Sequence, residues 1–187
     1  MTPLRQGFGG QALITEEYRA LNASLHVTNP NYGVSGHKWA EVIDKCITAT
    51  GANSVLDYGC GKETLAETLP YPITGYDPCL EGLDDPPIAH DFVVCSDVLE
   101  HIEPECIDAV LDDLKRLAIK GVFLLVATMP AKKTLADGRN AHILQRPPEW
   151  WLPKIMERWT LEKFQTVKVQ KDGAKIDGEF YVFAVAK

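Results

Sequence analysis

Two aspartates and a pair of glycines mark the stretch of sequence where ligand chemistry is expected. A short apolar run reaches Asp57, and Gly59 and Gly61 then follow on either side of Cys60. Glycine allows the unusual φ values of a tight turn and lets a ligand approach the backbone. A second apolar run ends at Asp77, whose carboxylate could accept both hydroxyls of a ribose. The pattern predicts a strand, a glycine turn and a helix over KETLAETL, with a nucleoside-containing ligand on the turn.

The spacing of the glycines separates two kinds of nucleoside site. A dinucleotide-binding turn has the pattern G-x-G-x-x-G, but Thr64 occupies the last glycine position here. The D-x-G-x-G pattern instead resembles motif I of the S-adenosylmethionine-dependent methyltransferases of the Rossmann-like class I, and the layout is similar to small bacterial and phage-type members. The sequence departs from that family at Glu63, where the motif usually has a third glycine. An ordinary strand and turn is the alternative interpretation.

The resemblance implies S-adenosylmethionine as the cofactor and assigns residues to its binding. In the family, the glycine turn lies beneath the methionine and ribose, and the acidic residue at the end of the second strand holds the ribose. The cofactor-binding residues implied in this chain are Asp57, Gly59, Cys60, Gly61, Asp77, Asp97 and Val98.

The elements that must position these residues predict an α/β fold. Aliphatic and β-branched runs alternate with helix-compatible segments, which is typical of a sheet covered by helices. We expect strands at 54–58, 72–76, 91–96 and 121–129, a β-hairpin over 164–187, and helices at 39–50 and from Pro104 to Leu117.

The segment 78–90 is too short, and too rich in proline and acid, for a further helix and strand. The third strand of the family's plan is therefore expected to be reduced or absent. The resemblance then implies a Rossmann-like, doubly wound, mostly parallel sheet with a C-terminal antiparallel hairpin and a strand order of about 2-1-4-5-7-6. Residues 1–187 are expected to form a single methyltransferase domain.

The N-terminal part is expected to lie over the cofactor. Residues 1–14 are glycine-rich and expected to be mobile, and residues 15–37 read as a capped helix followed by a loop. In the family this segment folds over the cofactor as a lid, so Tyr32 and His37 are candidate lid residues. A plain surface loop with a capping Ser35 is the equal alternative.

Two histidines are candidates for the chemistry itself. Ligands of open α/β sheets bind beyond the carboxyl ends of the strands, where DVLEHI and DGRNAH are expected to meet. An oxygen acceptor must lose its proton, and His101 or His142 suits that role. Arg139, Asn140 and Trp150 are expected to line a substrate pocket. The Glu-His pair could instead serve packing and cofactor contacts.

The motifs predict methyl transfer to an oxygen or nitrogen on a small molecule or terminal group. One alternative is a protein that binds S-adenosylmethionine without turnover; another is an NAD-linked oxidoreductase. A third is metal-assisted 2′-O-methylation of a nucleic-acid end, since D-x-x-E-H and a later histidine are similar to the metal-binding set of small-RNA methyltransferases. A divalent metal would then be held by Asp97, Glu100, His101 and His142.

Composition narrows the choice of partners and location. A net charge of −7 provides no basic field for duplex nucleic acid. The five cysteines are odd in number and never form C-x-x-C, so neither a disulfide framework nor a zinc site is expected. The chain has no apolar run of membrane-spanning length, and a cytoplasmic location is expected. The acceptor and the oligomeric state are left open.

Overall fold

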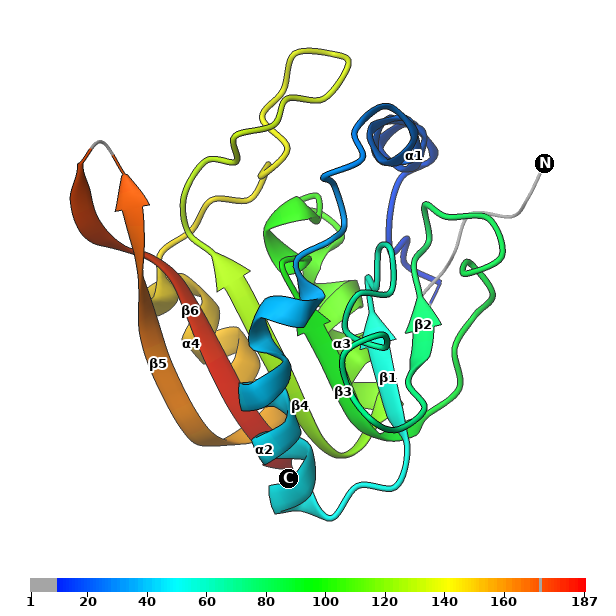
Figure 1. The fold of residues 1–187 in the computed structure, drawn as a ribbon, viewed down its shortest axis with the longest axis vertical. Helices are drawn as coiled ribbons and strands as arrows, with labels where there is room; N and C mark the ends of the chain where they lie inside the picture. The colour runs from blue at the N-terminus through cyan, green and yellow to red at the C-terminus, as the bar shows by residue number, and fades with distance from the viewer. Residues whose placement is uncertain (1–9, 172) are drawn as a thin grey trace.

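The computed structural model describes residues 10–171 and 173–187, and this part of the chain contains one mixed sheet. Its strands are β1 (Val55–Tyr58), β2 (Thr74–Tyr76), β3 (His90–Ser96), β4 (Ala118–Ala127), β5 (Trp159–Lys171) and β6 (Ala174–Ala186). The order across the sheet is β2-β1-β3-β4-β6-β5 (Figure 1). The strands β1 to β4 are parallel to one another, and β6 is antiparallel to both of its neighbours, β4 and β5. This confirms the predicted Rossmann-like order with its third strand absent.

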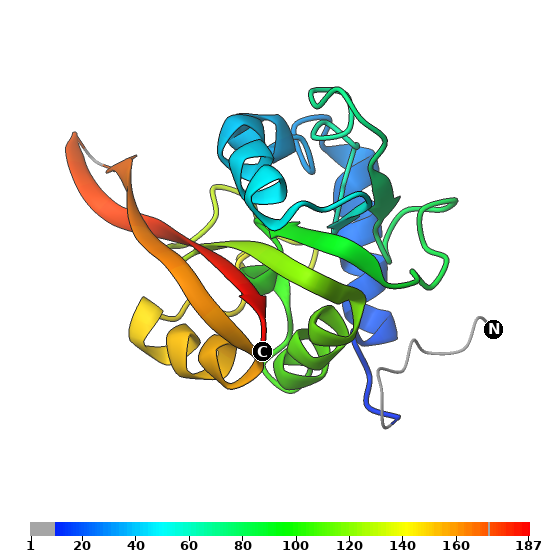
Figure 2. The ribbon, with the colours of Figure 1, turned by 90° about the horizontal axis from the view of Figure 1, so that it is seen from below.

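Helices cover the two faces of the sheet. Helix α2 (Ala40–Thr50) lies on one face, and α3 (Ile107–Leu117) and α4 (Pro148–Arg158) lie side by side on the other (Figure 2). The apolar face predicted for α3 is buried, and β4 is buried almost throughout because helices cover it on both sides. None of the described helices has the length and apolar character needed to span a membrane.

Helix α1 (Glu16–Thr28) lies above the carboxyl ends of the parallel strands (Figure 1). Thr15 caps it by accepting a hydrogen bond from the backbone N–H of Tyr18, and Thr15 also donates from its N–H and its hydroxyl to the buried Glu103 carboxylate, at 2.8 and 2.7 Å. The start of the helix is therefore tied to the segment before α3.

The mobility expected for residues 1–14 concerns mainly residues 1–9, which lie outside the described chain. Leu13 and Ile14 are buried, and each joins one of the apolar clusters of the interior. The side chains of these two residues thus pack against the folded domain, and the mobility of the segment stays a prediction.

The helix predicted after the glycine turn is not formed. Residues 64–68 form hydrogen-bonded turns that do not continue as an α-helix, and Glu63 has a φ of 56°, in the left-handed region. A left-handed residue cannot continue a right-handed helix. The departure from the family's motif is thus conformationally conservative, because Glu63 adopts the backbone state that glycine favours.

Candidate functional site

A cavity of about 630 Å³ opens at the carboxyl ends of β1, β3 and β4. Its walls come from α1, the loop that follows it, the glycine turn, the loop after β4 and the far end of the β5–β6 hairpin. The volume lies within the usual range for small-molecule sites. The position agrees with the rule that ligands of open α/β sheets bind beyond the carboxyl strand ends.

The floor of the cavity is the glycine turn, which packs against the loop over residues 29–35 that follows α1, called the lid loop below. The backbone N–H groups of Gly59 and Cys60 both donate to the Tyr76 carbonyl, at 2.7 and 3.0 Å. Gly61 has a φ of 52°, and a Cβ there would lie 2.5 Å from the carbonyl oxygen of Gly33. The turn therefore forms a cradle of backbone atoms, with no side chain at Gly61 to fill it.

Asp77 lies beside this cradle, as the sequence predicted. Its side chain is buried; Oδ2 accepts from the Gly61 N–H at 3.2 Å and Oδ1 from the Cys79 N–H at 2.9 Å. The His26 Nε2 atom lies 3.8 Å from Oδ2. Burial is the main reason that the pKa of Asp77 is raised and the pKa of His26 is lowered. Sequence reasoning missed His26, because nothing in a helical pattern shows that it turns toward Asp77.

Asp57 also lines the cavity and is buried. Burial, together with the nearby charges of Asp77 and Glu63, raises its pKa to about 7. Asp57 is therefore partly protonated at neutral pH.

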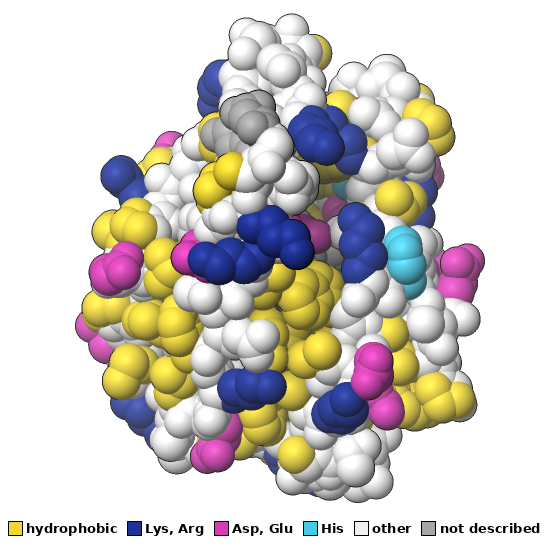
Figure 3. Space-filling view, turned by 60° about the vertical axis from the view of Figure 1, so that its left-hand side comes forward, with side chains coloured by type: hydrophobic (Ala, Val, Ile, Leu, Met, Phe, Trp, Pro, Cys, Tyr) yellow, Lys and Arg dark blue, Asp and Glu magenta, His cyan; other side chains and the backbone are white. Residues whose placement is uncertain are grey.

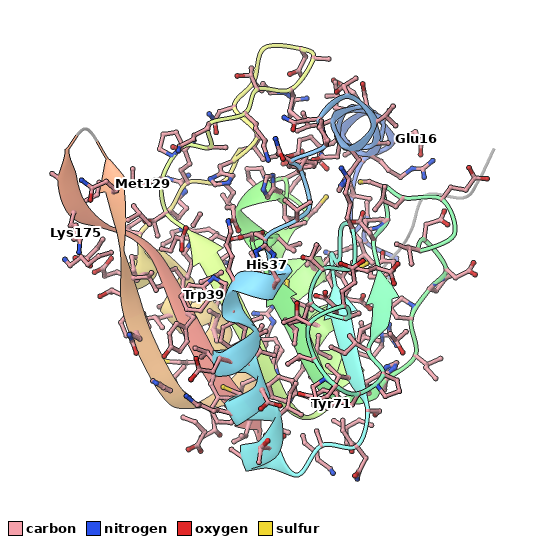
Figure 4. The ribbon with its side chains drawn as sticks, viewed as in Figure 1. Glu16, His37, Trp39, Tyr71, Met129 and Lys175 are labelled. Atoms are coloured by element: carbon pink, nitrogen blue, oxygen red, sulfur yellow. The ribbon has the colours of Figure 1, made fainter. Side chains whose placement is uncertain are left out.

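The predicted histidine pair does meet at the cavity. The rings of His101 and His142 are 4.8 Å apart between centroids and nearly perpendicular. The Nδ1 atom of His142 lies 2.6 Å from the carbonyl oxygen of Met129, which follows β4 (Figure 4). A carbonyl only accepts hydrogen bonds, so in the neutral ring Nδ1 carries the proton and the lone pair is on Nε2. Burial lowers the pKa of both histidines, that of His101 to about 3.

Glu100 lies next to this pair and is fully buried. Its Oε1 atom accepts from the Ala127 N–H at 3.1 Å and is 4.0 Å from the Nε2 atom of His142, while Oε2 has no hydrogen-bond partner among the described residues. Burial raises the pKa of Glu100 well above its usual value, with Asp97 adding to the effect. Burial therefore favours the uncharged forms of both Glu100 and His142.

Three of the four predicted metal ligands come together. One ligand atom each from Glu100, His101 and His142 lies within 4.8 Å of the others, and within the described residues this is the one such group. Asp97 lines the cavity but does not belong to this group of three ligands. Asp97 has a φ of 56°, which turns the backbone sharply at the end of β3.

Tyr32 occupies the position expected of a lid residue. Its hydroxyl donates to the Asn22 Oδ1 atom at 2.8 Å and lies 3.4 Å from Nδ1 of His101. The Tyr32 ring packs against His26, and the Lys133 ammonium lies 5.0 Å from its centroid. The lid loop thus connects the Asp77 side of the cavity with the histidine side.

Four other predicted residues do not line the cavity. The side chain of His37 is exposed in the 3₁₀ turn Gly36–Trp39 before α2 (Figure 4), and Arg139 pairs on the surface with Asp137. Asn140 forms hydrogen bonds with the backbone of Ala131. Trp150 packs edge-on against Trp151, on the face of the sheet that α3 and α4 cover. The expected aromatic wall is therefore not built by Trp150. Lysines that the sequence did not single out line the cavity in their place: Lys38, Lys132 and Lys133.

Comparison with known proteins agrees with this geometry. A protein-family model described as "Methyltransferase domain" matches residues 34–167. No curated protein matches the sequence.

Similar folds occur among solved methyltransferases. The 1,6-didemethyltoxoflavin-N1-methyltransferase of Burkholderia thailandensis, with bound 1,6-didemethyltoxoflavin and S-adenosylhomocysteine, has a TM-score of 0.61 at 16% identity, covering 100% of this chain and 92% of that chain. The magnesium protoporphyrin IX methyltransferase of Synechocystis PCC 6803, with bound SAH, has a TM-score of 0.56 at 18% identity, covering 82% and 84%. The methyltransferase domain of bacterial CtHen1-CN has a TM-score of 0.53 at 15% identity, covering 81% and 99%.

Proposed function

The chain belongs to the methyltransferase domain family, and on that premise we propose that it transfers the methyl group of S-adenosylmethionine to an oxygen or nitrogen acceptor on a small molecule or terminal group. The observation that carries this proposal is the buried Asp77 carboxylate beside the side-chain-free cradle at Gly61. The family resemblance does not favour the NAD-linked alternative. A cytoplasmic location stays a prediction; all five cysteines are free thiols.

The residues of the cavity fit this cofactor. A Cβ at Gly61 would meet the backbone of Gly33, so the loop that contains Gly33 can pack on the turn and close this side of the cavity only because a side chain is missing there. Asp77 would hold the ribose hydroxyls, and Asp57, Gly59 and Cys60 would line the rest of the binding surface. When bound, S-adenosylmethionine supplies a methyl group on a positively charged sulfur, which is already activated for displacement.

The protein's own contribution is alignment and proton removal. Holding the donor and acceptor in line can supply several kcal/mol of the barrier reduction. For a hydroxyl acceptor, the lone pair on His142 Nε2 would take the proton, because its Nδ1–H is fixed on the Met129 carbonyl. His101 would position His142 through their edge-to-face ring contact. A carboxylate acceptor would need no base.

Calorimetry with Asp77→Ala tests the cofactor site. Hydrogen bonds to a charged acceptor contribute about 1.5 to 3 kcal/mol, so the variant should bind S-adenosylmethionine and S-adenosylhomocysteine roughly tenfold or more weakly than the wild type. Glu81→Ala removes an exposed carboxylate from the same segment and should leave the affinity unchanged. Equal affinity in the wild type and a folded Asp77→Ala would refute the assignment.

Turnover separates catalysis from binding alone. An active methyltransferase forms S-adenosylhomocysteine from S-adenosylmethionine when a panel of acceptors is supplied. A protein that only binds the cofactor shows normal calorimetry and no product with any acceptor of the panel.

Metal-assisted 2′-O-methylation is the second candidate function, and it has one specific observation in its favour. Glu100, His101 and His142 offer three ligand atoms within 4.8 Å, and in the part of the chain that the structure describes Oε2 of Glu100 has no partner that a cation would displace. Turnover that is lost with a chelator and restored by magnesium or manganese would support it. Turnover unaffected by the chelator would leave His142 acting as a base without a metal.

A further inference from the structure

The outer part of the cavity carries a cluster of lysines in a chain whose net charge is −7. Lys38 comes from the short 3₁₀ turn Gly36–Trp39 before α2, and Lys132 and Lys133 come from the loop after β4. Two loops nearly one hundred residues apart in sequence therefore bring positive charge to the same opening. In Figure 3, dark blue Lys and Arg side chains gather around a hollow on this side of the molecule.

None of these three lysines has a carboxylate within ion-pair distance among the residues that the structure describes. Several other lysines do, including Lys45 with Glu41 and Lys154 with Asp108, at 2.7 and 2.9 Å. The charge at the cavity is thus not neutralised by a direct partner, unlike charge on the outer helices.

Lys133 is also held in place rather than free in solvent. Its ammonium donates to the Asn31 carbonyl and lies over the Tyr32 ring, so it links the loop after β4 to the lid loop. Burial lowers the pKa of Lys133, and the neighbouring charges of Lys38 and Lys62 lower it further. The ammonium groups therefore lie close enough to repel one another, a cost that a bound anion would relieve.

The acidic residues that line the cavity fall into two sets. Asp57 and Asp77 belong to the glycine turn and the adjoining strand end, on the side assigned to the cofactor. Glu179, from β6, is half-buried. Its pKa is raised mainly by burial and also by the charge of Asp97, while the charge of Lys38 acts in the opposite direction. Asp97 also lies near the lysines, since its charge raises the pKa of Lys133. Asp57 and Asp77 thus mark the cofactor side, whereas the lysines share the acceptor side with Asp97 and Glu179.

We propose that the methyl acceptor is a small molecule bearing a carboxylate or phosphate group, which Lys38, Lys132 and Lys133 bind at the outer part of the cavity. The inference rests on the proposed methyl transfer and names the substrate class of the same site. The anion would fix the acceptor so that its nucleophilic atom faces the cofactor, with His142 on the same cavity wall.

Two probe anions test this, inorganic phosphate and benzoate, titrated by calorimetry and by ³¹P or ¹H NMR. Each is titrated into the free protein and into protein saturated with S-adenosylhomocysteine. Removing two charges that contact an anion should weaken binding about tenfold or more in Lys38→Gln/Lys133→Gln. The control Lys115→Gln removes a charge from α3, away from the cavity, and should bind both anions like the wild type. The probe that binds more tightly identifies the recognised group.

A turnover arm uses matched acceptors with and without the anion. If the recognised group is a carboxylate, hydroxybenzoates should be methylated and hydroxybenzamides should not. If it is a phosphate, glycerol phosphates should be methylated and glycerol should not. Equal use of charged and neutral acceptors, or anion binding that the double variant leaves unchanged, would overturn the inference.

The remaining outcomes separate this inference from the function on which it rests. If S-adenosylhomocysteine fails to bind while the lysines still bind anions, the proposed function fails and the anion site stands. If the cofactor binds normally and neither anion binds, the anion site is refuted and the proposed function stands. Tighter binding of a short single-stranded RNA through the same lysines would overturn the small-molecule assignment.

Discussion

Burial is the main influence on the protonation of the carboxyl groups at the cavity. The pKa of Asp57 is raised to about 7, and those of Asp77 and Glu100 are also raised, in each case first by burial. A carboxyl whose folded pKa exceeds its unfolded value stabilises the fold fully below the unfolded pKa. That stabilisation is lost as the pH rises through the folded pKa.

Asp57→Asn should therefore stabilise the cofactor-free protein at alkaline pH. The neutral amide avoids burying a charge, and we expect a gain of about 1 kcal/mol or more at pH 8, since one pKa unit corresponds to about 1.4 kcal/mol. At pH 5 the wild-type carboxyl is protonated in the fold, so the difference should narrow. Urea unfolding at the two pH values measures this, with the exposed Asp85→Asn as control. A difference that does not change with pH would contradict the assigned pKa.

His142→Ala is expected to separate chemistry from cofactor binding. If Nε2 is the base for an oxygen acceptor, turnover should fall by about 10² to 10⁴ while S-adenosylmethionine binds unchanged. The exposed His37→Ala serves as the control. Weakened cofactor binding by His142→Ala would show that the residue acts on the other side of the cavity.

The pH profile gives an independent check on the same residue. The pKa of His142 is lowered from its usual value, so the base stays neutral below pH 6.5. The acidic limb of kcat/KM should accordingly lie below pH 6.5.

At the scale of elements, the glycine turn and the lid loop are held together by backbone contact. Gly51, the left-handed cap of α2, has a φ of 60°, and a Cβ there would meet nothing within 4 Å, whereas a Cβ at Gly61 would lie 2.5 Å from the Gly33 oxygen. Both alanine variants incur the left-handed strain of about 1 to 2 kcal/mol, but only Gly61→Ala must also displace the lid. We expect Gly51→Ala to keep cofactor affinity and Gly61→Ala to lose stability and affinity together. Similar effects of the two substitutions, compared by urea unfolding and calorimetry, would argue against this packing.

The elements were predictable where hydrophobic pattern and length decide them. The continuous apolar run of β4 and the short segment after Asp77 determine the central strand and the missing third strand. The helix over 62–69 could not be judged from its favourable composition, because the left-handed conformation of Glu63 depends on the turn before it. The sequence also cannot show which way the first turn of α4 faces, and Trp150, which was expected in the pocket, packs against Trp151 instead.

At the scale of the whole molecule, the cavity is an assembly of distant segments. Its lining runs from Ile14, just before α1, to Glu179 on β6. Glycine spacing reveals the Asp77 side of such a site, because the signal is local. Lys38 and Lys133, and likewise His26 and Asp77, become neighbours only when the chain folds, so no local sequence pattern predicts their proximity.

A site assembled from both ends of the chain cannot persist in the unfolded state, and this makes its ligands thermodynamic reporters. A ligand that binds only the folded protein at one hundred times its Kd adds about 2.7 kcal/mol of stability, which for a domain of this size raises Tm by roughly 5 to 10 °C. S-adenosylhomocysteine should produce such a shift in the wild type and a smaller one in Asp77→Ala at the same concentration. The absence of a shift would show that the ligand does not favour the fold. With the cofactor site saturated, any further rise caused by an added compound would come from the rest of the cavity, so a melting curve can identify the acceptor before any product is detected.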